Sequence, residues 1–259
     1  MLKTIAFSAA ALLPLAQSNA NTLIGDGHID LNLGYSAETG FQATGNYTGP
    51  SFPDTVYSLN AAVFHLDEDA QIVSPGDSLV GSGFGDFSIL GPQGSDAWLI
   101  DQTQQPSVPW LGFSGYGIGG SHNGATNDLA IFDGASIEIS FLGFEGPAGA
   151  MFGMWNYGVF GGLNPVFSSH HDVMMASDSF ILNNGQHVHY AWGFSEPGEY
   201  TINLAVNGTI NGIAVPTGTF DVHFLVGDAP PAVPEPRTTA MLLGVSALGF
   251  AVYRSRRAR

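Results

Sequence analysis

Apolar and polar residues alternate along most of the chain, and short clusters of Gly, Pro, Asn and Asp separate the alternating runs. A period of two is typical of strands that bury one face, whereas an amphipathic helix repeats its apolar positions every three or four residues. The run 220–226 is the clearest case, because Phe and Val alternate with Asp and His. The pattern predicts strands over the ranges 29–33, 56–66, 137–141, 200–206 and 220–226.

Helices are not predicted in the body of the chain. No segment combines a helical period with capping residues, and the 35 Gly and 15 Pro indicate many turns. We therefore predict an all-β fold, specifically an antiparallel β-sandwich. The Gly-rich stretch 112–124 is either a long loop or a junction between two β subdomains.

The first twenty residues have the features of a signal peptide. Lys3 precedes an apolar run over 5–15, and the segment ends in small residues before Ala20. We expect signal peptidase to cut after Ala20. Residues 1–20 are therefore excluded from the fold, and residues 21–226 are assigned to the β-sandwich domain.

A second apolar stretch lies at the other end of the chain. Residues 227–236 form a Pro-rich linker, and residues 237–259 contain an apolar run that ends in a cluster of arginines. As a helix this run would be about 22 to 25 Å long, which is shorter than the roughly 30 Å hydrocarbon core of a bilayer. It predicts a short transmembrane anchor whose arginines stay on the cytoplasmic side.

This end of the chain also resembles a known sorting signal. A Pro-Glu-Pro motif, a short apolar helix and a terminal Arg cluster follow one another in the order of the PEP-CTERM signal of exported bacterial proteins. The resemblance implies a bacterium with two membranes and an exosortase that cuts near the motif. It also implies release from the membrane to the cell surface, the outer membrane or the extracellular matrix. An ordinary membrane anchor is the alternative. The residues concerned are Pro234, Glu235, Pro236, Arg254, Arg256 and Arg257.

Basic and acidic residues lie in different parts of the chain. All six Lys and Arg residues lie in the end segments, and 21 of the 22 acidic residues lie between them, because only Glu235 falls outside. Nucleic acid is excluded as a partner of the body, since phosphate binding needs Lys or Arg. A body with many carboxylates and without Lys or Arg favours cation binding, although a solvated acidic surface is the simpler explanation for most carboxylates. Cysteine is absent, which excludes disulfides, thiol catalysis and cysteine-bound metals.

Two histidines stand two positions apart in a further predicted strand. On a strand, His187 and His189 project to one face roughly 6.5 to 7 Å apart, from where two imidazoles can bind one metal ion. Val188, Tyr190 and Trp192 would then face the core. A hydrogen-bonded structural role is the alternative for the pair. Histidines and carboxylates on other predicted strands complete the hypothetical site as ligands or as groups that orient them. The candidate metal ligands are His28, His187, His189, His223, Asp30 and Asp221.

Other histidines are weaker candidates. His65 and His122 are expected to be hydrogen-bonded structural residues, and the sequence His170-His171-Asp172 follows a loop-like segment. A turn over 196–198 predicts that the next strand returns antiparallel to the strand that carries the histidine pair.

At the histidine pair the body resembles the choice-of-anchor M domain with its surface-anchored repeat. The resemblance spans most of the exported chain and implies a surface protein with an interchangeable anchor, and the family offers no enzymatic activity to carry over to this chain. Relatives that accompany metal-uptake transporters imply a link to zinc or manganese. The matching segments are Gly27-His28-Ile29-Asp30-Leu31, 87–91, 98–100, Pro109-Trp110-Leu111-Gly112, Gly146-Pro147 and the block from His187 to Tyr200.

Three functions remain after these exclusions. The first is an exported, non-catalytic surface or matrix protein that binds a divalent metal, zinc or manganese, through the histidine cluster. The second is a secreted hydrolase that cleaves polysaccharides with a pair of carboxylates, although no pair among the 21 is singled out. The third is a purely structural matrix or adhesion module. Signal peptidase, exosortase and the membrane are the expected partners.

Overall fold

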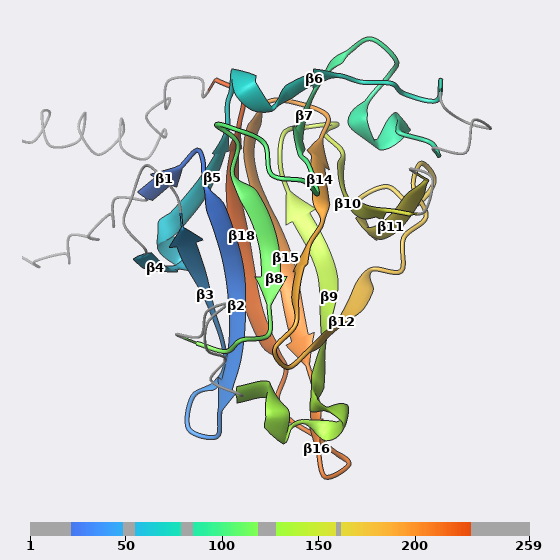
Figure 1. Cartoon of the computed structure of the whole chain (residues 1–259). Helices are drawn as coiled ribbons and strands as arrows, with labels where there is room; N and C mark the ends of the chain where they lie inside the picture. The colour runs from blue at the N-terminus through green and yellow to red at the C-terminus, as the bar shows by residue number, and fades with distance from the viewer. Residues whose placement is uncertain (1–21, 49–54, 79–84, 119–127, 159–161, 229–259) are drawn as a thin grey trace, which may run out of the picture.

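The computed structural model describes residues 22–48, 55–78, 85–118, 128–158 and 162–228, and these residues form an all-β structure (Figure 1). The predicted fold class is confirmed. The signal peptide, the Pro-Glu-Pro motif and the apolar C-terminal run lie outside the described residues. Within the described part, no helix has the length and apolar character needed to cross a membrane.

The largest sheet has six strands and is called the β15 sheet. β1 and β18 run parallel to β5, and every other neighbouring pair is antiparallel. In spatial order its strands are β1 (Thr22–Ile24), β5 (Ala62–Leu66), β18 (Gly218–Val226), β15 (Gly198–Asn207), β9 (Ser136–Glu145) and β12 (Ser179–Asn183).

Two five-stranded sheets are named after their central strands. The β2 sheet comprises, in order, β13 (His187–His189), β8 (Trp110–Ser114), β2 (His28–Ser36), β3 (Gly40–Thr48) and β4 (Thr55–Ser58). The β14 sheet comprises β11 (Leu163–Ser168), β10 (Phe152–Tyr157), β14 (Ala191–Phe194), β7 (Asp96–Ile100) and β6 (Gln71–Val73). A two-stranded ribbon joins β16 (Thr209–Ile210) and β17 (Ile213–Ala214).

Helical structure in the described residues is limited to short 3-10 turns. These are η1 (Leu59–Ala61), η2 (Glu68–Ala70), η3 (Ser88–Leu90), η4 (Asp128–Ile131) and η5 (Asp133–Ala135).

The main core lies between the β15 sheet on one side and the β2 and β14 sheets on the other. The fully buried Trp192 is at its centre, with ring centroids of Phe113, Phe152 and Phe224 at 5.7, 6.0 and 5.6 Å. These aromatic residues come from all three sheets, and the same core joins Ile29 and Leu31, which precede the Gly-rich stretch, to Ile202 and Leu204, which follow it. The described residues on the two sides of that stretch therefore share one core and do not form separate ones. Further buried members include Ile29, Leu31, Ile202, Leu204 and Val222.

A smaller cluster covers the opposite face of the β14 sheet. Ala191 and Trp155 point to this side because they alternate with Trp192 and Met154, which face the main core. The β14 sheet is thus buried on both faces. The other buried members of this cluster are Phe87, Ile89, Leu90, Ala97 and Met174.

The structure corrects two details of the predicted strands. The range 56–66 is not one strand, because η1 separates β4 in the β2 sheet from β5 in the β15 sheet. The strand after the turn at 196–198 does not return beside β14, since β15 pairs with β9 and β18 instead. In both cases the chain crosses between layers, and a pattern of buried and exposed positions does not record which sheet a strand joins.

Candidate metal centre

Four predicted ligands come together on the outer face of the β2 sheet. β8 lies between β2 and β13, so the register places Asp30 and His189 on either side of Gly112. His28 and Asp30 alternate with Ile29, which is fully buried in the main core, and therefore point to the other face of the sheet. The alternation on β13 brings His187 and His189 to the same outer face.

The ligand atoms of these residues converge. The Nε2 atom of His28 lies 3.2 Å from that of His187 and 3.1 Å from that of His189, and the last two are 2.9 Å apart. Asp30 Oδ1 lies 2.6 Å from His187 Nε2 and 3.0 Å from His28 Nε2. One ligand atom from each of the four residues lies within 4.8 Å of all the others.

This spacing suits a small metal ion. Zinc binds imidazole nitrogen at about 2.0 to 2.1 Å, which separates neighbouring ligands in a tetrahedral shell by roughly 3.3 Å. The five separations given above, 2.6 to 3.2 Å, approach that value. The cluster of His28, Asp30, His187 and His189 could therefore hold a metal ion with little rearrangement.

Hydrogen bonds cannot satisfy the three nitrogens among themselves. Each imidazole nitrogen is either a donor that carries a proton or an acceptor that offers a lone pair. Among the Nε2 atoms of His28, His187 and His189, at least two must have the same role, and that pair repels. A cation between them removes the conflict, because all three nitrogens then act as acceptors.

The protonation states of His189 and Asp30 also suit metal ligands. Burial, reinforced by the nearby charges of His187 and His28, lowers the pKa of His189 to about 3, so this imidazole is neutral at pH 7. Burial by itself would raise the pKa of Asp30, but hydrogen bonds from His187 and His28 outweigh it and hold that pKa well below its usual range. A neutral imidazole and an ionised carboxylate are the forms that bind metals.

Asp30 occupies the position of a ligand. A carboxylate that only orients a metal-binding histidine contacts the ring nitrogen that faces away from the metal. Asp30 instead contacts His28 and His187 at Nε2, the same atoms that converge. The side chains of His28 and His187 remain 16% and 19% exposed, which leaves an ion a route from solvent.

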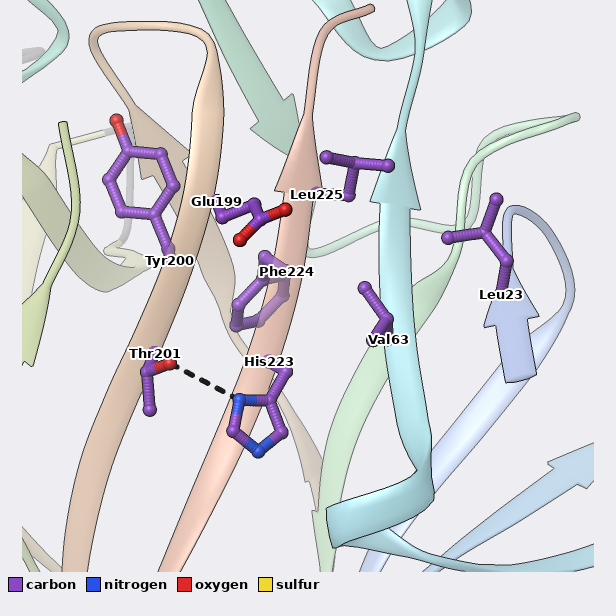
Figure 2. Close-up of a pocket in the computed structure, with 8 residues that line it drawn as sticks. All are labelled: Leu23, Val63, Glu199, Tyr200, Thr201, His223, Phe224 and Leu225. Atoms are coloured by element: carbon purple, nitrogen blue, oxygen red, sulfur yellow. Dashed lines mark hydrogen bonds between the residues drawn. The ribbon is translucent and has the colours of Figure 1, made fainter. Parts of the chain in front are cut away.

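The remaining two predicted ligands lie elsewhere. His223 and Asp221 are on β18, whose buried positions Val222 and Phe224 face the same core from the opposite layer. The side chains of Asp221 and His223 alternate with these and therefore point to the outer face of the β15 sheet. Figure 2 shows His223 in a pocket on this face, with Nδ1 3.2 Å from Thr201 Oγ1. The expectation that these residues complete the metal site is thus corrected.

The weaker histidine candidates have structural partners. His171 Nε2 lies 2.7 Å from Asp178 Oδ2, and His170 Nδ1 lies 2.8 Å from the hydroxyl of the adjacent Ser169. His65 Nε2 lies 3.4 Å from the carbonyl oxygen of Gly227. His122 lies outside the described residues.

One neighbour of the cluster was not predicted as part of it. Trp110 stacks on His189 with ring centroids 3.7 Å apart and planes inclined by 10°. In the sequence Trp110 stands out only as part of the segment Pro109-Trp110-Leu111-Gly112 of the family resemblance, and its pairing with His28 across β2 and β8 places it at the site.

Comparisons with known proteins do not identify the chain. No protein-family model matches it, and no curated protein has a matching sequence. The solved structure of the N-terminal domain of PorA matches with a TM-score of 0.22 and 9% identity, over 36% of this chain and 64% of that one. A similarity at this level assigns neither fold nor function, and the chain covers less than two thirds of that structure.

Proposed function

We propose that this protein is an exported, non-catalytic surface or matrix protein that binds a divalent transition-metal ion, with zinc as the preferred ion. The observation that carries the proposal is the convergence of three imidazole Nε2 atoms and the Asp30 carboxylate, with neighbouring atoms 2.6 to 3.2 Å apart. The cluster offers three nitrogens and one oxygen. Calcium and magnesium prefer oxygen ligands, whereas imidazole suits zinc and its neighbours among the transition metals.

The number of protein ligands supports a non-catalytic role. Catalytic zinc sites use three protein ligands and keep the fourth position for water or substrate, whereas structural sites fill all four from the protein. His28, Asp30, His187 and His189 would supply all four ligands of a tetrahedral shell. A bound ion would link β2 to β13 across 157 or more positions of a chain that has no cysteine. It would thereby take the place that a disulfide has in many exported proteins.

Location at the cell surface is the part of the proposal that rests on the sequence. The signal-peptide features before Ala20 and the Pro-Glu-Pro motif at 234–236 support export followed by sorting. Fractionation of cells that express the full chain, with and without an exosortase, tests this. A tail that is retained equally in both strains would contradict the sorting mechanism and leave a plain anchor.

Metal binding is tested on the purified full chain after chelation. Thermal melting with Zn²⁺, Mn²⁺ and Ca²⁺ should show the largest rise with Zn²⁺. The double variant His187→Ala, His189→Ala should lose that rise. His223→Ala is the matched control, because this histidine lies in the opposite layer, and it should respond as the unmodified chain does. Identical zinc responses of the chain and the double variant would refute the proposed site.

A further inference from the structure

The strand between the two ligand-bearing strands shapes the metal centre without supplying a ligand. β8 pairs with β2 on one side and β13 on the other. Its residues Trp110 and Gly112 are two positions apart and share the outer face of the sheet, while Leu111 between them is fully buried in the main core. Trp110 stacks on the imidazole of His189, and Gly112 leaves open the space beside that ring which a side chain would occupy.

Gly112 provides the space in which that imidazole lies. A Cβ atom at this position would fall 2.8 Å from Cε1 of His189 and 2.9 Å from each of its two ring nitrogens. Contacts this short are not tolerated, so any larger residue would displace the ring. The requirement is for the absence of a side chain and not for an unusual backbone, because the φ angle of Gly112 is not in the left-handed region.

Trp110 fixes the plane of the same ring. Its indole stacks on His189 at 3.7 Å, and its centroid lies 4.8 Å from that of His28, so it contacts two of the three imidazoles. The indole is itself held in place, because Trp110 Nε1 donates a hydrogen bond to the carbonyl oxygen of Gln102 at 2.9 Å. Gly112 and Trp110 together restrict the plane of the His189 ring, and in this plane Nε2 points at the other ligands.

We propose that Trp110 and Gly112 are positioning residues that make the metal centre selective for a small, four-coordinate, imidazole-preferring cation such as Zn²⁺. This inference rests on the proposed function. Because the His189 ring is restricted in its plane and position, its Nε2 atom stays at the short distance from the other ligand atoms that zinc requires. Manganese and calcium need longer bonds and more ligands, and they would gain from a site that can expand.

The test uses the purified full chain and four variants. Gly112→Ala fills the space under His189. Trp110→Leu keeps apolar bulk without a flat ring, and Trp110→Phe keeps a flat ring. Gly45→Ala is the matched control in the same sheet, because a Cβ there would lie 3.5 Å from Leu59, an ordinary contact. Zinc and manganese affinities are measured by competition with a chromophoric chelator, and the visible absorption of bound Co²⁺ reports its coordination number.

Gly112→Ala and Trp110→Leu should weaken zinc binding by about 10- to 100-fold, the usual effect of losing a group that orients a metal ligand. Manganese binding should change less, so the preference for zinc falls. The intense Co²⁺ absorption of a four-coordinate site should decrease in both. Trp110→Phe should recover most of the affinity, and Gly45→Ala should match the unmodified chain.

The outcomes separate the two proposals. Absence of zinc binding by the unmodified chain overturns the proposed function itself. The second possible outcome is that the unmodified chain binds zinc, while Gly112→Ala and Trp110→Leu keep its zinc affinity, metal preference and Co²⁺ spectrum. This outcome overturns only the positioning role. Gly112→Ala could fail to fold, which its circular dichroism without metal would show. In that case the zinc affinities of Trp110→Leu and Trp110→Phe are compared to test the positioning role. Equal zinc affinities of those two overturn the inference.

Discussion

The Nε2 atoms of His28 and His189 lie 3.1 Å apart, although 161 positions separate the two residues in the sequence. Only the folded chain brings them together, since β8 must first pair with β2 and with β13. Binding of an ion at this point is therefore linked to folding. An ion that binds the folded chain and not the unfolded one stabilises it by mass action.

Zinc should raise the free energy of unfolding in proportion to the logarithm of its concentration. At a free concentration a thousand times its dissociation constant, the gain should be about 4 kcal/mol. Urea denaturation of the full chain, with buffered zinc and with chelator, measures this difference. The variant His28→Ala should show little of the gain. A gain of the same size in His28→Ala would mean that zinc acts elsewhere.

Replacing Asp30 by Asn should weaken zinc binding by at least about 10-fold. The amide keeps the shape of the side chain but loses the charge, and Asp30 Oδ1 contacts two of the ligand nitrogens at 2.6 and 3.0 Å. Isothermal titration calorimetry provides the measurement. Asp178→Asn is the matched control, because Asp178 pairs with His171 away from the cluster. Equal losses in the two variants would exclude a specific role for Asp30.

The metal-free protein should lose stability as the pH falls from about 6.5. Burial lowers the pKa of His189 to about 3 in the folded state, so between these values the unfolded chain binds a proton at this residue that the folded chain does not. Stability therefore rises with pH across this window. His189→Phe retains an aromatic ring against Trp110. It should make the free energy of unfolding depend less steeply on pH between pH 4 and 6, by the equivalent of at most one bound proton. Urea denaturation at several pH values, in the presence of chelator, measures the free energy of unfolding of both proteins. The same dependence of this free energy on pH in the unmodified chain and in His189→Phe would disprove the prediction.

Truncation of the central tryptophan should destabilise the fold strongly. Trp192 is fully buried and its ring lies close to aromatic residues from all three sheets. Trp192→Ala should cost about 3 to 5 kcal/mol, the usual range for a buried Trp or Phe. Ile213→Ala should change stability by less than about 0.5 kcal/mol, because Ile213 is 72% exposed. Urea denaturation measures both, and a small effect at Trp192 would contradict the shared core.

A buried tyrosine hydroxyl holds the connection between β14 and β15. Tyr200 donates to the carbonyl oxygen of Glu196 at 2.8 Å, four residues earlier in the chain, and burial raises the pKa of this phenol. A tyrosine that bonds back to the preceding loop has the same role in immunoglobulin-like sandwiches. Tyr200→Phe should cost about 1 to 3 kcal/mol, because the carbonyl oxygen loses its partner. Unchanged urea denaturation would show that water replaces the hydroxyl.

The periodic pattern predicted the strands better than their partners. It identified β18 correctly, since Val222, Phe224 and Val226 are buried and His223 is not. It also placed His187 and His189 on one face of a strand. The pattern could not show that the chain leaves the β2 sheet at Tyr190 and enters the β14 sheet one residue later. Sheet membership depends on long-range pairing, which local alternation does not encode.

The same limit explains the candidate site. His28 and Asp30 were correctly grouped with the histidine pair, but His223 fitted the pattern equally well and lies in the other layer. Gly112 belongs to the segment Pro109-Trp110-Leu111-Gly112 of the family resemblance, but nothing in the sequence linked it to the metal site, because a glycine that makes room for a distant ring looks the same in a sequence as a glycine in a turn. Only the register of β8 between β2 and β13 reveals its role.

The position of β18 has a mechanical consequence. The last described strand is an interior one, paired with β15 over nine residues from Gly218 to Val226 and with β5 over four. Tension applied to the C-terminal end of β18 along its axis would load these hydrogen bonds together in shear, whereas an edge strand pulled sideways would release its bonds one by one. A domain tethered through this strand is thus attached at a place that resists force.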